Sequence, residues 1–227
     1  KQLSELDDQG LLDTLSLLPA VYRQWIDQQR ARIEDPKERL ERYRQVAVEA
    51  MNACDTACQR IQAGIDLLKQ DAQAMQSFRF ANQAMWQQRI HSLLAESRRA
   101  GRITALLELD VPENRSWRPF QLAFVLLNLP GVTQLDHPER GEDASALADL
   151  LWFPTGGGKT EAYLGLTAYT LAIRRLQGVV GGRLGHAGVA VIMRYTLRLL
   201  TLQQFQRAAA LICACEVMRR ADPATWG

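Results

Sequence analysis

One short stretch of this sequence constrains its fold more than any other: a glycine-rich turn between an apolar run and a helical pattern. Residues 149–153 are mostly apolar, residues 154–160 are Pro-Thr-Gly-Gly-Gly-Lys-Thr, and residues 160–176 keep a helical spacing of apolar side chains. Glycines let the backbone curl so that successive N–H groups point at phosphate oxygens, and a helix N-terminus reinforces the attraction. We therefore predict a phosphate-binding loop between a buried strand and a helix.

The residue types at the end of this turn match phosphate and metal chemistry. Lys159 can neutralise the β- and γ-phosphates of a nucleotide, and the Thr160 hydroxyl can bind Mg²⁺, so both are candidate catalytic residues. The residues of this segment expected to bind the nucleotide cofactor are Thr155, Gly156, Gly157, Gly158, Lys159, Thr160 and Glu161. A flexible glycine-rich connector is the alternative, and Gly-Lys-Thr between a strand and a helix argues against it.

The pattern around this loop predicts an α/β fold for the second half of the chain. A second apolar strand is expected at 189–193, after a glycine-rich connection, and a last helix at 197–220. Upstream, a helix is expected from Pro119 to about Leu127, ending before Pro130, and then a surface loop over 131–148. Apolar strands that alternate with helices are typical of a parallel sheet covered on both faces.

Residues 1–115 form a different region, in which we expect only helices. Pro19 can open the first, and Asp35-Pro36-Lys37-Glu38 resembles a capped helix start for the second. A third helical pattern follows over 75–94, so we predict an up-and-down bundle or a long antiparallel hairpin. The domain boundary is placed between 1–115 and 116–227. A packing scaffold and a partner- or DNA-facing arm both fit the helical region.

Charge is unevenly distributed, although the formal net charge is only +2. Residues 1–115 carry 16 Lys and Arg against 17 Asp and Glu, whereas residues 116–227 carry 11 against 8. After Glu161, eight arginines face only Glu216 and Asp222, which makes that stretch about +6. Such a stretch can bind a polyanion, although solvated helix faces give the same count.

Several functional classes are not indicated. The sequence has no run of 18 apolar residues and no apolar signal segment at its start, so we predict a cytoplasmic protein without membrane contact. Cys54 and Cys58 lie four apart, and Cys213 and Cys215 two apart. Neither spacing is that of a zinc knuckle, so we expect reduced thiols and no metal held by cysteine.

The loop departs from the general phosphate-loop form, because Phe153 stands where that form has its first glycine. Pro-Thr-Gly-x-Gly-Lys-Thr resembles motif I of the superfamily 2 helicases and translocases. The resemblance implies the first part of a RecA-like motor domain that uses ATP and Mg²⁺. It also implies that neighbouring helicase motifs flank the loop.

Two such neighbours can be recognised. Trp117-Arg118-Pro119-Phe120-Gln121 resembles the adenine-recognition element, in which Gln121 would bind the base, with Phe120 or Arg118 beside it. Residues 193–203 resemble motif Ia, which holds the nucleic-acid backbone. The residues implied as nucleic-acid contacts are Arg194, Thr196, Arg198 and Gln203. A plain helix start is the alternative for the first element, and a plain amphipathic helix for the second.

Taken together, these strings resemble the helicase-subunit family of the DISARM anti-phage defence systems, the DrmA family. That resemblance implies a bacterial defence complex that acts on DNA, with a companion protein, DrmB. No Asp-Glu dipeptide occurs in the sequence, although hydrolysis needs an acidic pair after a later strand. We therefore expect a truncated motor: an ATP-dependent DNA helicase or translocase whose isolated fragment should not hydrolyse ATP. The alternative is a non-catalytic nucleotide-responsive adaptor, in which the helical arm recruits partners.

Overall fold

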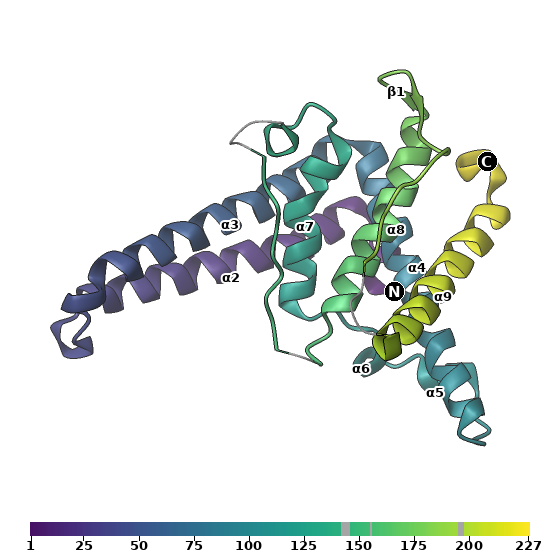
Figure 1. The fold of residues 1–227 in the computed structure, drawn as a ribbon, viewed down its shortest axis with the longest axis horizontal. Helices are drawn as coiled ribbons and strands as arrows, with labels where there is room; N and C mark the ends of the chain where they lie inside the picture. The colour runs from purple at the N-terminus through teal and green to yellow at the C-terminus, as the bar shows by residue number, and fades with distance from the viewer. Residues whose placement is uncertain (142–145, 155, 195–197) are drawn as a thin grey trace.

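The computed structural model describes residues 1–141, 146–154, 156–194 and 198–227, without the side chains of residues 198–201. Helices dominate it (Figure 1). The longer ones are α2 (Asp8–Glu34), α3 (Arg44–Gln70), α4 (Ala72–Arg99), α7 (Pro119–Thr133), α8 (Lys159–Gln177) and α9 (Arg198–Ala221). The short helical turns are α1 (Gln2–Glu5), η1 (Pro36–Glu38), η2 (Glu41–Tyr43), α5 (Leu106–Leu109), α6 (Pro112–Arg115), η3 (Pro138–Arg140) and α10 (Pro223–Trp226).

One hydrophobic core joins helices from both sides of residue 115. Helix α4 packs against α8 and α9, α3 packs against α7, and α7 packs against α8. Phe78 of α4, Leu126 of α7 and Tyr169 of α8 are almost completely buried in this core. A pair of buried hydroxyls adds specificity, because Thr133 and Tyr169 share a hydrogen bond of 2.6 Å. The division at residue 115 stays a prediction, and its two sides are packed on each other.

Helices α2 and α3 form an antiparallel hairpin that projects from the body as an arm (Figure 1). Asp55 of α3 accepts hydrogen bonds from both Arg23 and Arg30 of α2, which ties the two helices together away from the core. Val21 and Trp25 remain exposed on α2. This hairpin is one of the two arrangements that the helical pattern predicted.

The starts of the first two long helices differ from their predicted positions. Helix α2 begins at Asp8, because the Asp7 side chain accepts the Gly10 N–H, and Pro19 lies inside it. Asp35 accepts the Lys37 N–H as predicted, but it caps only the turn η1. Arg39 then adopts a left-handed conformation with φ of 54°, which ends that turn, and α3 begins at Arg44. The sequence therefore predicts the capping role of Asp35 correctly, but not the length of the helix that this residue caps.

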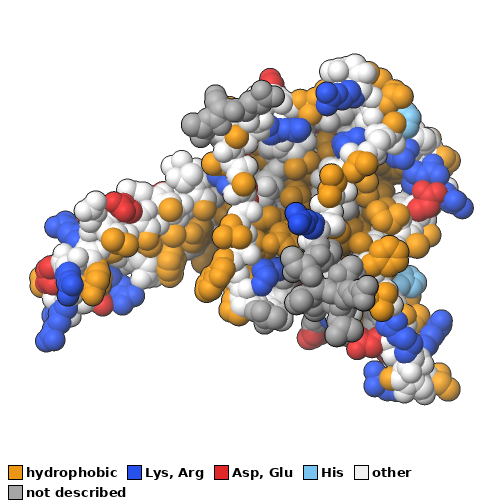
Figure 2. Space-filling view, in the orientation of Figure 1, with side chains coloured by type: hydrophobic (Ala, Val, Ile, Leu, Met, Phe, Trp, Pro, Cys, Tyr) orange, Lys and Arg blue, Asp and Glu red, His pale blue; other side chains and the backbone are white. Residues whose placement is uncertain are grey.

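The prediction of a parallel sheet is wrong for the described residues. Residues 149–153 and 189–193 have no regular secondary structure, and the sheet of the described residues consists of β1 (Val179–Val180) paired antiparallel with β2 (Arg183–Leu184). Leu150, Trp152 and Ile192 are each more than 80% exposed, with relative accessibilities of 86%, 82% and 86%. Figure 2 shows hydrophobic side chains spread over this face of the molecule. The RecA-like α/β fold class is therefore overturned by a mainly helical architecture.

The helices predicted after the loop agree with the structure, unlike the predicted strands. Residues 160–176 and 197–220 were expected to be helical, and α8 and α9 occupy almost these positions. Helix α7 begins at Pro119 as predicted but continues through Pro130 to Thr133, because Leu129 and Pro130 are buried against the body. None of the helices in the described ranges has the length and apolarity needed to cross a lipid bilayer.

Candidate phosphate-binding site

In the glycine turn at 154–158, two described glycines have backbone angles that other residues rarely adopt. Gly156 and Gly158 have φ of 81° and 89°, in the left-handed region that favours glycine. A Cβ on Gly157 would lie 2.3 Å from the Phe153 ring, so that position admits no side chain. Gly158 then serves as the N-cap of α8 without a side-chain hydrogen bond. The described glycines of the turn thus lead directly into a helix N-terminus, and Thr155 lies outside the described residues.

Phe153 has a structural role in this turn that the sequence did not reveal. Its ring stacks on Phe120, with centroids 4.0 Å apart and an angle of 12° between the rings. The stack places the start of α7 directly against the turn, where the general phosphate-loop form would have a small residue. Phe120 therefore contacts the protein itself in this structure, whereas the sequence resemblance places it beside a base.

The N-terminus of α7 also holds the backbone of the turn. The Arg118 guanidinium donates a hydrogen bond of 2.8 Å to the Gly157 carbonyl, and Gln121 Nε2 donates one of 2.7 Å to the Gly158 carbonyl. Gln121 Oε1 accepts the Arg118 N–H at 2.8 Å. With 4% relative exposure, Gln121 is buried. The three residues of the predicted adenine element are thus brought to the turn, and they support it.

Lys159, Thr160 and Glu161 form the first turn of α8. Lys159 Nζ donates to the Phe153 carbonyl and lies 3.4 Å from the Pro154 carbonyl, so its ammonium group stands over the turn. Such contacts with neutral carbonyls are weaker than those with anionic oxygens. The ammonium group can therefore exchange them for phosphate oxygens. Thr160 is half-buried beside it.

A second set of predicted residues, Arg194, Thr196, Arg198 and Gln203, lies in the sequence before and within α9. Arg194 is exposed and lines a cavity of about 420 Å³ together with Tyr163 and Leu166 of α8. Gln203 is exposed on α9. Thr196 lies outside the described residues, and Arg198 begins α9 with a side chain that is also outside them. The structure thus places Arg194 near the N-terminal half of α8.

An ion pair between α8 and α9 has no counterpart in the sequence patterns. The Arg207 guanidinium donates to Glu161 Oε1, although the two residues are 46 positions apart. Glu161 Oε2 is buried, with no hydrogen-bond partner among the described residues. Because Arg207 belongs to no motif, only tertiary structure can find this contact.

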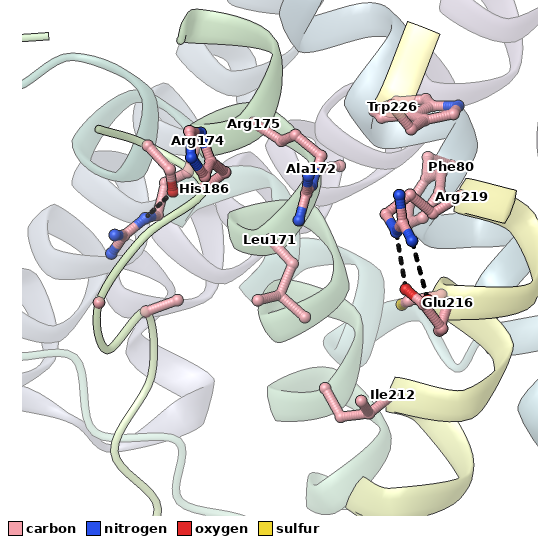
Figure 3. Close-up of a pocket in the computed structure, with 14 residues that line it drawn as sticks. Phe80, Leu171, Ala172, Arg174, Arg175, His186, Ile212, Glu216, Arg219 and Trp226 are labelled. Atoms are coloured by element: carbon pink, nitrogen blue, oxygen red, sulfur yellow. Dashed lines mark hydrogen bonds and ion pairs between the residues drawn. The ribbon is translucent and has the colours of Figure 1, made fainter. Parts of the chain in front are cut away.

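Two cavities are poor candidates for a nucleotide. One of about 50 Å³, lined by Trp117, Gln121 and Glu161 among others, is too small. Another of about 200 Å³ lies between α8 and α9, near the opposite end of α8 from the glycine turn (Figure 3). There Arg219 is paired with Glu216, and Arg174 donates to the Gly185 carbonyl. No described candidate residue lines this second cavity.

The cysteines show no metal chemistry in the described residues. Cys58 and Cys215 are buried, and all four cysteines are free thiols. Burial raises the pKa of the Cys215 thiol to about 12, so it stays protonated at neutral pH. The described residues also contain no group of three or more His, Cys, Asp or Glu that could hold a metal ion.

Comparison with known proteins points to one named system. No protein-family model matches the chain. It is 40% identical over 225 residues to the DISARM protein DrmA of Bacillus paralicheniformis (strain ATCC 9945a / NCIMB 11709 / CD-2). The alignment takes in 97% of this chain and 19% of that protein, so the chain spans about a fifth of its relative. The similarity to this part of the relative therefore takes in almost the whole chain, including the helical half, which carries no recognised motif.

Proposed function

We propose that this chain forms the ATP-phosphate-binding and nucleic-acid-contacting part of a DNA helicase or translocase in anti-phage defence. The observation that carries the proposal is the position of Gly157 and Gly158 before α8, where Arg118 and Gln121 donate hydrogen bonds to their carbonyls. The similarity to a DISARM protein supports the defence setting. DNA is the proposed substrate and a protein such as DrmB the proposed partner, as the resemblance of the sequence motifs implies.

The residues of the turn fit the phosphates of ATP. Positive φ at Gly156 and Gly158 opens the backbone, and no Cβ fits at Gly157. The first N–H groups of α8 lack a capping side chain, so an anion can accept from them. Lys159 would hold the β- and γ-phosphates by charge. The fit is limited to the phosphate groups of the nucleotide, because the neighbouring cavity is too small to enclose a base.

A metal ion would join the phosphates at α8. Thr160 follows Lys159 in the first turn and would supply its hydroxyl as a ligand for Mg²⁺. Such an ion would supply positive charge beside the phosphates that Lys159 holds. The chain itself supplies phosphate binding and orientation, while the acidic pair needed for hydrolysis is not recognisable in its sequence.

Nucleic-acid contact is proposed for the segment that leads into α9. Arg194 is exposed there, and Thr196, Arg198 and Gln203 complete the proposed contact set. Backbone phosphates would bind to these arginines and to the N–H groups at the helix start, without sequence selectivity. The excess of arginine after Glu161 favours the same anionic partner.

The test is Lys159→Ala in the full-length protein, with Lys69→Ala on the exposed surface of α3 as the matched control. We expect Lys159→Ala to lower DNA-stimulated ATP turnover about 100-fold or more, because charge on the transferred phosphate goes uncompensated. Lys69→Ala should match the wild type. Normal turnover in Lys159→Ala would refute the phosphate site. Nucleotide binding without DNA-stimulated turnover in the wild type would favour the adaptor instead.

A further inference from the structure

We infer that Arg60 of α3 is a positioning residue for the phosphate site: it fixes the segment that leads into the glycine turn, and so sets the affinity of the turn for phosphate groups. The inference rests on the proposed function and deepens it by naming a residue of the helical half that holds the site in place. It starts from an ion-pair cluster that joins Arg60 to two residues 79 and 89 positions further along the chain.

The cluster consists of one guanidinium and two carboxylates. Arg60 Nη1 and Nη2 donate to the two carboxylate oxygens of Asp149 at 2.6 and 2.8 Å, and Nη2 also donates to Glu139 Oε2 at 2.8 Å. Arg60 Nε lies 2.8 Å from Glu139 Oε1. The side chains of Arg60, Glu139 and Asp149 are 16%, 22% and 25% exposed, so water screens the cluster only partly. A bidentate pair of this kind fixes the orientation of the Asp149 carboxylate as well as its distance.

Arg60 projects from a tightly packed part of α3. The next residue, Ile61, is buried in the hydrophobic core. One turn further on, a Cβ on Gly64 would lie only 2.0 Å from the Leu126 carbonyl, so α3 and α7 are in close contact there. Close-packed helices shift little without a cost in packing. The guanidinium is therefore a fixed cation, to which the loop after α7 is attached.

Asp149 begins the segment that ends in the glycine turn. Figure 1 shows this segment running from the loop near α3 to the start of α8. Because a chain extends at most about 3.5 Å per residue, the four steps from Asp149 to Phe153 span no more than about 14 Å. Leu150 and Trp152 are largely exposed, so packing does little to hold the middle of the segment. The position of Phe153 therefore depends on its own contacts and on the anchor at Asp149.

Phe153 connects this segment to the groups that would bind phosphate. Its ring stacks on Phe120 and lies against Gly157, and its carbonyl accepts a hydrogen bond from the Lys159 ammonium group. If Asp149 is released, Phe153 gains freedom to move, and Gly157 and Lys159 lose contacts that set their positions. Binding of phosphate must then also order the turn, which lowers the affinity. Arg60 thus pre-organises the site without touching the phosphates.

The experiment measures the affinity of the full-length protein for two probes in the presence of Mg²⁺: a fluorescent non-hydrolysable ATP analogue, and inorganic tripolyphosphate as its competitor. We expect Arg60→Gln to weaken the binding of both by a similar factor, about fivefold, because the lost contact acts on the phosphate turn. In an Asp149→Asn background, the same Arg60→Gln change should have little further effect. Arg60→Lys should restore most of the affinity, because an ammonium group can still pair with Asp149.

Glu139→Gln separates a positioning role from a general effect on the loop. Glu139 pairs with the same guanidinium, but the segment that enters the turn begins at Asp149. Glu139→Gln should therefore change both affinities less than about twofold, whereas Asp149→Asn should weaken them as Arg60→Gln does. Arg44→Gln is the matched control on α3, since the Arg44–Glu34 pair is largely exposed, and it should match the wild type.

Equal losses in Glu139→Gln and Asp149→Asn would overturn the inference, as would a loss for the ATP analogue without one for tripolyphosphate. If hydrogen exchange in α4 and α8 shows that Arg60→Gln is unfolded, folded Asp149→Asn decides: weaker binding supports the inference and normal binding overturns it. If the wild type binds neither probe, the proposed function fails and the inference fails with it. Binding by the wild type with the same affinities in Arg60→Gln refutes this inference alone.

Discussion

Gln121 shows how one side chain can be placed correctly by sequence and still do something different in the structure. The sequence resemblance puts it at an adenine base, and the structure does bring it to the phosphate turn. There, its amide spans the Arg118 N–H and the Gly158 carbonyl, and its side chain is buried. Because the oxygen and the nitrogen of this buried amide are both hydrogen-bonded to the backbone, the amide is better placed to fix the turn than to bind a base.

We therefore expect Gln121→Ala to weaken binding of ATP and GTP by a similar factor, about fivefold, because the turn loses a hydrogen bond that fixes Gly158. Competition titrations with both nucleotides measure this. As a control, Gln62→Ala removes an exposed amide on α3 that bonds Asp66, and it should change neither affinity. A loss confined to ATP would instead support the adenine role that the sequence resemblance implies.

At the scale of the element, the arm formed by α2 and α3 shows which features of a helix can be predicted from its own sequence. Apolar spacing predicted the long helices, but the starts of α2 and α3 depended on Asp7 and on the left-handed Arg39. The arm lies outside the main body, so few tertiary contacts support its outer turns. Ion pairs such as those of Asp55 with Arg23 and Arg30 carry more of its local stability.

We expect Asp55→Asn to loosen the arm without unfolding the body, because two arginines of α2 lose their anionic acceptor. Amide hydrogen exchange should quicken in the outer turns of α2 and α3, consistent with a loss of roughly 1 kcal/mol. Exchange in α4 and α8 should stay the same. Glu34→Gln is the matched control, since its pair with Arg44 is 59% exposed on both sides and contributes little. Faster exchange throughout the body would show that the arm is part of the global core.

At the scale of the whole molecule, the shared core is the main organising feature. Helix α4 belongs to the motif-free half of the sequence, yet it packs against the two helices that follow the phosphate turn. Residues 1–115 therefore provide a packing surface for the helices that carry the candidate site, which fits the scaffold role considered for them in the sequence analysis. The relative's similarity across 97% of the chain is consistent with one structural unit.

We expect Phe78→Ala to destabilise α4, α8 and α9 together, because Phe78 is 1% exposed at the centre of this core. A buried Phe-to-Ala change costs about 3–5 kcal/mol. Hydrogen exchange in the full-length protein should quicken in all three helices. Val21→Ala on the exposed surface of the arm should have almost no effect. Faster exchange in α4 alone would mean that the helical half has a separate core.

The sequence alone determined what local chemistry can determine. Helical periodicity located α4, α8 and α9, and the glycines at 156–158 predicted a curled loop before a helix. These features depend on residues a few positions apart, where backbone sterics and side-chain spacing suffice.

Only the tertiary structure decided which segments become partners. Residues 149–153 and 189–193 have the composition of buried strands, yet a strand needs a neighbour to take its hydrogen bonds and a layer to cover its side chains. Neither segment has a strand partner among the described residues, and most of the residues in both are exposed. The Glu161–Arg207 pair is the opposite case, in which two residues outside any shared pattern meet because α8 and α9 pack. The composition of a segment indicates which secondary structure it can adopt, whereas the segments that it packs against depend on contacts between distant parts of the chain.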